Sequence, residues 1–111
     1  MVEGLWIVQY EGSQGNGGGV AVFMKGRILG GDTGFVYTGN YRAEGKNLSG
    51  QVKVSNFLPG IPSVLGISGD FELRIVVVVD GNTMKGTGSL VGNEGSGVAL
   101  KLTKVSDLPV S

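Results

Sequence analysis

Apolar and polar residues alternate along several short stretches of this chain, and glycine, asparagine and aspartate separate these stretches. A period of two is typical of a strand with one buried face, and almost no part of the sequence shows the period of an amphipathic helix. Short turns between consecutive strands predict an antiparallel meander. The pattern predicts eight strands, at residues 5–11, 19–25, 27–30, 34–43, 47–56, 70–79, 83–91 and 97–104.

The alternation also predicts which side chains face the core. On the fourth strand, Phe35, Tyr37 and Tyr41 share one face, and mainly polar residues occupy the other. On the sixth strand, Phe71 and Leu73 begin an apolar face that continues to the end of the strand. Short strands with one apolar face either stack as a sandwich or close into a barrel.

Glycines within the strands favour the barrel. Gly39, Gly50, Gly86 and Gly88 lie inside predicted strands, where glycine is unfavourable unless the backbone must bend. Closure of a barrel requires such bends. We therefore predict an all-β fold over residues 1–111, a single domain that forms a small antiparallel up-and-down β-barrel of about eight strands.

The connections between strands are predicted from residues that favour turns. The Asn-Gly pair at 16–17 and the Asp-Gly pair at 80–81 accept positive φ angles, and residues 92–95 are expected to form a longer hairpin loop. The irregular segment 57–69 is expected to cross one end of the sheet. A proline at the start of a helical turn predicts one short helical turn near residues 61–66.

Five glycines occur between residues 12 and 22, which read GSQGNGGGVAV. The glycine spacing fits neither the dinucleotide-binding pattern nor the P-loop, which also needs a Gly-Lys-Ser/Thr tripeptide. The residues that follow are β-branched and aromatic, so no helix N-terminus points at the glycines. We interpret residues 12–19 as a mobile hairpin loop without a direct function.

Composition excludes several classes of function. The chain has no cysteine and no histidine, and its nine basic residues balance nine acidic residues. Thiol chemistry, the usual transition-metal ligands and the usual general base are therefore absent together. The acidic residues are scattered singly, and the basic residues form no stripe for nucleic acid phosphates. We expect no enzymatic activity, no metal or cofactor, and no nucleic acid partner.

The sequence contains no apolar stretch long enough to span a bilayer. Its first ten residues include an acid and have neither the basic region nor the cleavage site of a signal peptide. We therefore expect a cytoplasmic protein without a membrane partner.

The inward-facing aromatic residues allow two interpretations. They either fill the barrel, or they form the wall of a cavity, because an eight-stranded barrel is just wide enough to hold one small ligand. The sequence leaves both interpretations open. In the second, the ligand-binding residues of the barrel interior are Trp6, Phe35, Tyr37, Tyr41, Phe71 and Leu73.

Three stretches resemble the GrlR-type negative regulators of type III secretion. They are GGDTGFVYTG at residues 30–39, IPSVLGISGDFEL at residues 61–73, and the layout of the opening residues 4–32. The resemblance implies a lipocalin-like, calycin-like barrel, a homodimer and an apolar interior. It also implies regulation through binding of a transcriptional activator rather than through binding of DNA.

The same resemblance implies a partner-binding loop after the fourth strand, where the family carries a run of acidic residues. Here the loop reads YRAEGKNLSG, and its charged residues are Arg42, Glu44 and Lys46. Because two cations flank the single acid, we expect that this loop does not bind the family's activator.

The leading hypothesis is a non-enzymatic regulatory or interaction protein, and the alternative is a carrier or sensor of a small apolar ligand. We also expect a homodimer, because Val76 and Val78 place apolar side chains on the outer face of the sixth strand and the net charge is zero.

Overall fold

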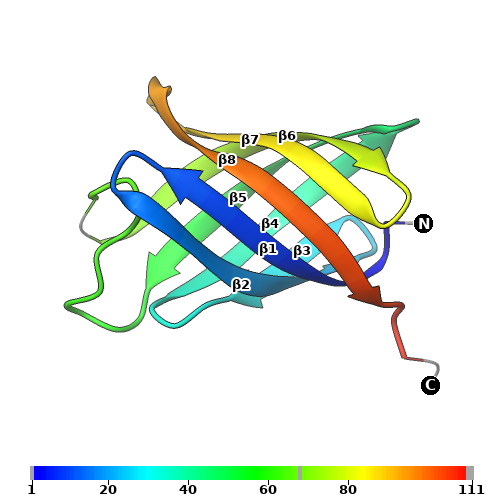
Figure 1. Ribbon diagram of the computed structural model, residues 1–111, viewed down its shortest axis with the longest axis horizontal. Helices are drawn as coiled ribbons and strands as arrows, with labels where there is room; N and C mark the ends of the chain where they lie inside the picture. Colours follow the sequence, from blue (N-terminus) through cyan, green and yellow to red (C-terminus); the bar gives the residue numbers. More distant parts are fainter. Residues whose placement is uncertain (1, 68, 110–111) are drawn as a thin grey trace.

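The computed structural model describes residues 2–67 and 69–109, and these residues form one closed antiparallel barrel of eight strands (Figure 1). Each strand pairs with the next one along the chain, and the last pairs with the first, which confirms the all-β, up-and-down barrel predicted from the sequence. The strands are β1 (Gly4–Gly12), β2 (Gly15–Met24), β3 (Arg27–Gly31), β4 (Phe35–Glu44), β5 (Asn47–Asn56), β6 (Phe71–Asp80), β7 (Thr83–Leu90) and β8 (Asn93–Ser106).

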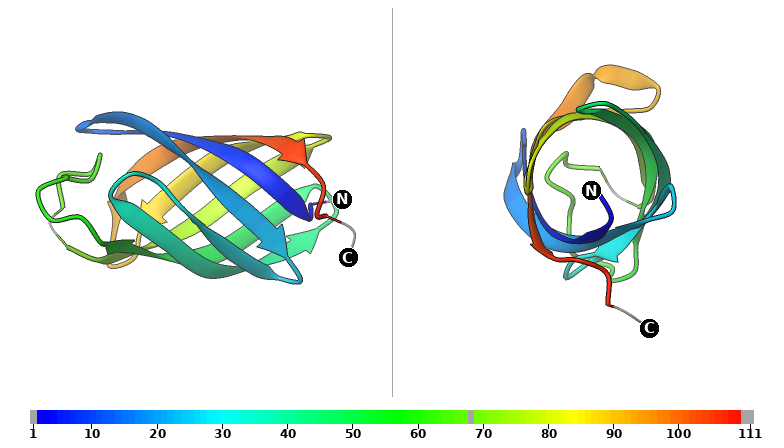
Figure 2. Two further views of the ribbon diagram at one scale, coloured as in Figure 1. Left: turned by 90° about the horizontal axis from the view of Figure 1, so that it is seen from below. Right: turned by 90° about the vertical axis from the view of Figure 1, so that its right-hand side faces the viewer.

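The inward faces of the strands form the core, as the alternation predicted. Phe35 is buried, and Tyr37, Tyr41 and Phe71 pack against the buried cluster from the same faces. Viewed along its axis, the barrel is a ring of strands, with the N-terminal residues at one end and the 57–69 connection at the other (Figure 2). The buried apolar residues are Trp6, Val8, Ala21, Phe23, Ile28, Phe35, Leu48, Val52, Val54, Leu73, Ile75, Val77, Met84, Val98 and Leu102.

Glycines on the inner face allow neighbouring strands to approach closely. A Cβ atom on Gly39 would collide with the carbonyl oxygen of Gln51, and one on Gly86 would collide with that of Val76. These contacts are formed by backbone atoms, which cannot rotate away as a side chain can. A tightly curved sheet brings such atoms together on its concave side, so glycine is required there.

The first hairpin turns at residues 13–14, so the turn predicted at residues 16–17 is wrong. Asn16 and Gly17 belong to β2, where they pair with Glu11 and Tyr10. The observed register stacks the ring of Phe23 edge-on against Trp6, with a centroid distance of 6.0 Å. Core packing thus outweighs the local preference of an Asn-Gly pair for a hairpin turn. The expected loop at residues 12–19 is therefore strand for most of its length.

Two further turns begin one residue away from their predicted starts. The β6–β7 hairpin turns at Gly81 and Asn82, between the paired residues Asp80 and Thr83. The β7–β8 hairpin turns at residues 91–92 and is shorter than the predicted loop. In both hairpins glycine supplies a positive φ angle, of 61° at Gly81 and 92° at Gly92.

The connection from β5 to β6 contains no helical turn in its described residues, so the helix predicted near residues 61–66 is wrong. Instead, the Gly66 amide donates to the Ser63 carbonyl oxygen at 3.0 Å, which closes a turn at Val64 and Leu65. The Ser63 hydroxyl oxygen accepts hydrogen bonds from the amides of Leu65 and Ile67 at 3.2 and 3.0 Å. A serine side chain that binds these amides competes with helix formation.

The glycine contacts predict a large difference between two otherwise similar substitutions. Gly86→Ala should lower the free energy of unfolding by about 1–3 kcal/mol, because the strands must separate to admit a methyl group. Gly95→Ala is the control, since the nearest atom to its Cβ would be Asn93 Oδ1 at 3.8 Å. The control should change stability by less than about 0.5 kcal/mol. Urea unfolding measures both values, and equal stability of the two variants would contradict the assignment.

Candidate ligand-binding cavity

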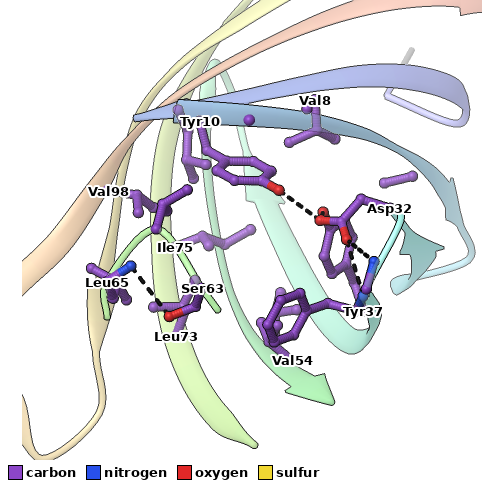
Figure 3. A pocket seen from close by; sticks show the side chains of 18 of the residues that line it. Val8, Tyr10, Asp32, Tyr37, Val54, Ser63, Leu65, Leu73, Ile75 and Val98 are labelled. Carbon is purple, nitrogen blue, oxygen red and sulfur yellow. Dashed lines mark hydrogen bonds between the residues drawn. The ribbon is translucent and has the colours of Figure 1, made fainter. Parts of the chain in front are cut away.

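The end of the barrel next to the 57–69 connection is hollow. It contains a partly open cavity of about 350 Å³, whose walls come from every strand except β7, from the β3–β4 loop and from residues 61–65 of the connection (Figure 3). The walls are mostly aliphatic and aromatic. Four of the six residues predicted to bind a ligand line this cavity, namely Phe35, Tyr37, Phe71 and Leu73.

The other end of the barrel is filled by aromatic side chains. Trp6 is fully buried and donates its indole N–H to the Val2 carbonyl oxygen at 2.8 Å. The ring of Phe23 packs against both Trp6 and Tyr41, with a centroid distance of 5.2 Å to Tyr41. Trp6 and Tyr41 do not line the cavity. Alternation showed that they face inward, but it carries no information about their height along the barrel axis.

Three polar side chains meet on the cavity wall. The Asp32 carboxylate accepts hydrogen bonds at Oδ2 from the hydroxyl groups of Tyr10, at 2.6 Å, and Tyr37. Its Oδ1 atom accepts from the backbone amides of Gly34 and Phe35, both at 3.0 Å (Figure 3). Four donors saturate the carboxylate. We call Tyr10, Asp32 and Tyr37 the carboxylate cluster.

Local sequence explains how Asp32 reaches this position. β3 ends at Gly31, and Asp32 begins a three-residue loop in which its side chain bonds to amides two and three residues ahead. This arrangement is an Asx turn, which aspartate favours. The loop lies between β3 and β4. Asp32 can therefore accept hydrogen bonds from Tyr37 of β4 and from Tyr10 of β1, which is two strands away from β3 in the barrel.

The glycine-rich stretch of β2 provides the space for this cluster. A Cβ atom on Gly17 would lie 2.8 Å from the ring and hydroxyl of Tyr10. A Cβ atom on Gly19 would lie 2.9 Å from the Tyr37 hydroxyl and 3.0 Å from Asp32 Cβ. Both positions require glycine for close approach. The run of glycines that fits no phosphate-binding template thus gives room to two phenols and a carboxylate.

The cluster is negatively charged. Partial burial alone would raise the pKa of Asp32, but the hydrogen bonds from Tyr10, Tyr37 and the two amides outweigh it and lower the pKa below the usual value. Burial, followed by the nearby carboxylate, raises the pKa of Tyr10 to about 12 and that of Tyr37 further. Both phenols therefore stay protonated at neutral pH. Asp32 is the only charged residue among the described residues that line the cavity.

Ser63, in the 57–69 connection, contributes a further hydroxyl group to the cavity wall. It is buried, and its oxygen accepts the two amide hydrogen bonds of the connection. Among residues 2–67 and 69–109, no hydrogen bond uses the Ser63 hydroxyl as a donor. Its proton is therefore available to an acceptor inside the cavity.

Sequence reasoning did not select Tyr10, Asp32 or Ser63 as ligand-binding residues. Tyr10 has the same inward parity as Trp6, so alternation was a usable signal for it. An aspartate two residues before a glycine at a strand start is the signal of an Asx turn. No local signal shows that Tyr10 and Asp32 meet, because 22 residues separate them.

The predicted partner-binding loop lies elsewhere. Arg42, Glu44 and Lys46 are exposed residues of the β4–β5 hairpin, whose turn is at residues 45–46. β4 begins at Phe35, which lines the cavity, and runs toward the filled end, where Tyr41 packs against Phe23. The hairpin that follows Tyr41 therefore lies beyond the filled end. The structure therefore separates the predicted partner-binding residues from the cavity.

Other kinds of site have little support in the described residues. No group of three or more acidic side chains is placed to hold a metal ion there. No helix in the same residues has the length and apolar character needed to cross a membrane. The sequence matches no protein-family model, and no curated protein is significantly similar to it.

The carboxylate cluster predicts a stability difference that depends on pH. Asp32→Asn should lower the free energy of unfolding by about 1.5–3 kcal/mol at neutral pH, the usual range for hydrogen bonds to a charged group. The pKa of Asp32 is lower in the folded state than in the unfolded state. Its stabilisation is therefore full above the unfolded-state pKa of about 4 and is lost as the pH falls through the folded-state pKa.

Urea unfolding of the wild-type chain and the Asp32→Asn variant between neutral and acidic pH measures this difference. The two curves should run parallel at neutral pH and converge below about pH 4. A difference that stays constant throughout acidification would show that the Asp32 charge does not stabilise the fold.

Proposed function

We propose that the protein binds one small apolar molecule in the hollow end of its barrel. The cavity itself supports this proposal. Protein interiors contain few voids larger than a water molecule, and an unfilled apolar cavity lowers stability. One end of this barrel is packed with Trp6, Phe23 and Tyr41, whereas Gly17 and Ala21 contribute little volume at the other. The same fold thus contains a packed end and a hollow end.

The size of the cavity limits the size of the ligand. An apolar cavity of about 150 Å³ is large enough to bind benzene. The cavity here, of about 350 Å³, holds roughly twice that volume. A ligand of roughly a dozen heavy atoms fits, which is a linear ten-carbon compound or a pair of fused rings.

The polar groups of the cavity support binding rather than catalysis. Asp32 already accepts four hydrogen bonds, so its carboxylate has no free lone pair with which to act as a base. Tyr10 and Tyr37 are both held in their protonated form. We infer a non-enzymatic carrier or sensor.

A substitution that fills the cavity tests this proposal. Ala21 is buried and faces the cavity, so Ala21→Phe should abolish binding of a neutral fluorescent probe of two fused rings such as 1-cyanonaphthalene. Ala99 is exposed on the outside of β8, and Ala99→Phe should leave binding unchanged. Fluorescence titration measures affinity, and urea unfolding checks that both variants fold.

Native mass spectrometry of the purified protein provides a second test. A reproducible excess mass that disappears in Ala21→Phe supports ligand binding in the barrel. A wild-type chain that binds neither the probe nor any copurified molecule would contradict the proposal.

A second function, protein interaction, is favoured by an apolar patch on the outer barrel wall. Cross-strand pairs join Ile7 to Val20 and Val22 to Leu29, so these side chains form one surface across β1, β2 and β3. Ile7, Val20 and Leu29 are 42%, 47% and 49% exposed. We call this surface, together with Leu5 and Val36, the β1–β4 face.

We propose that a second copy of the chain covers the β1–β4 face. A twofold contact places each surface against itself, and the six residues that define this face are all apolar, so none of them causes charge repulsion. The closed barrel also leaves no full-length strand edge for pairing, so a partner must pack against a face. The regulatory role implied by the resemblance to GrlR-type proteins is proposed to act through contacts of this kind.

The dimer expected from the sequence was placed on Val76 and Val78, which are 54% and 51% exposed. Their cross-strand neighbours are polar, with Val76 between Ser49 and Thr87. They therefore form a narrow stripe, and the β1–β4 face offers a broader apolar surface.

Two lysine substitutions distinguish the surfaces. Leu29→Lys should convert a dimer to a monomer in sedimentation velocity at micromolar concentration, because it places a charge at the contact. Val76→Lys should leave the dimer intact. A wild-type monomer would contradict self-association, and a dimer lost only in Val76→Lys would place the contact on β6.

A further inference from the structure

We propose that the cavity selects apolar molecules whose single polar end is a hydrogen-bond donor without negative charge, such as an alcohol or an amine, and discriminates against carboxylates. This inference rests on the proposed function and defines the chemical class of its ligand. It follows from the direction of the hydrogen bonds at the carboxylate cluster and from the charge of the cavity wall.

The donors of the cluster are all occupied. The hydroxyl protons of Tyr10 and Tyr37 point to Asp32 Oδ2, and the amides of Gly34 and Phe35 point to Oδ1. A carboxylate ligand needs donors and finds none free at this position. The phenolic oxygens keep lone pairs, so they can accept a hydrogen bond from a ligand hydroxyl or amine.

The charge of the cavity acts in the same direction. Asp32 is ionised at neutral pH, and no lysine or arginine is among the described residues that line the cavity. A ligand anion would lose its water and come close to a like charge in a medium of reduced polarity. An ammonium group would gain from the same field, and a neutral hydroxyl would be little affected.

Ser63 extends this preference to hydroxyl groups. Its proton has no acceptor among the described residues, while its oxygen is used by the amides of Leu65 and Ile67. A ligand hydroxyl can accept from Ser63 or donate to a phenolic oxygen of the cluster. A hydroxyl can therefore use either polar site, whereas an anion can use only Ser63 and is repelled by Asp32.

Three ten-carbon compounds test the preference at constant chain length. 1-Decanol, decylamine and decanoate are titrated at neutral pH against the wild-type protein loaded with 1-cyanonaphthalene. Decanol and decylamine should displace the probe with dissociation constants at least about tenfold lower than that of decanoate. Asp32→Asn should reduce this ratio about tenfold, whereas Glu11→Gln, which removes an exposed charge outside the barrel, should preserve it.

A second comparison needs no variant and decides the matter if Asp32→Asn does not fold. At about pH 4 an alkyl carboxylic acid is largely protonated, while the lowered pKa keeps Asp32 ionised. Decanoic acid should then bind nearly as tightly as decanol.

The outcomes separate the two proposals. If decanoate binds as tightly as decanol at neutral pH, the selectivity is wrong but the cavity still binds a ligand. If none of the three compounds binds and the probe also fails to bind, both the proposed function and the proposed selectivity are wrong.

Discussion

The interior volume of a closed eight-stranded barrel is the constraint on which the rest of this structure depends. Strand number fixes the diameter, so each inward-facing residue decides whether its level of the barrel is filled or hollow. Trp6, Phe23 and Tyr41 fill one level. At the other, Gly17 and Gly19 leave space, and Tyr10 and Tyr37 turn their hydroxyl groups toward Asp32 instead of packing across the axis. The division into two ends is thus a property of side-chain size on the inner face.

The carboxylate cluster shows how a charge is held on an apolar wall without a cation. Two phenols and two amides give Asp32 four neutral donors, which replace most of the hydration that partial burial removes. The same bonds connect β1 to the β3–β4 loop where β3 is too short to pair along the whole of β2. The carboxylate cluster therefore both connects separate parts of the barrel wall and sets the polarity of the cavity.

Alternation predicted the number of strands, their order and the inward position of residues such as Phe35 and Tyr37, because burial repeats every second residue. The turn preference of the Asn-Gly pair at residues 16–17 misplaced the first turn, because the register depends on Phe23 reaching Trp6, a contact that local preferences do not contain. Alternation also failed to separate Tyr41 from Tyr37, since parity fixes the face but not the height along the axis. The pairing of Tyr10 with Asp32 arises only when distant strands meet, so no local pattern shows it.

The hollow end has a consequence for how long the chain survives in a cell. A ligand that binds only the folded state raises the free energy of unfolding, by about 2.7 kcal/mol when its concentration is 100 times its dissociation constant. Proteases and chaperones act on the unfolded fraction, so a shift of this size changes steady-state abundance severalfold. Under the proposed function, degradation would remove empty barrels faster than loaded ones. The amount of protein would then follow the supply of its ligand without any change in gene expression.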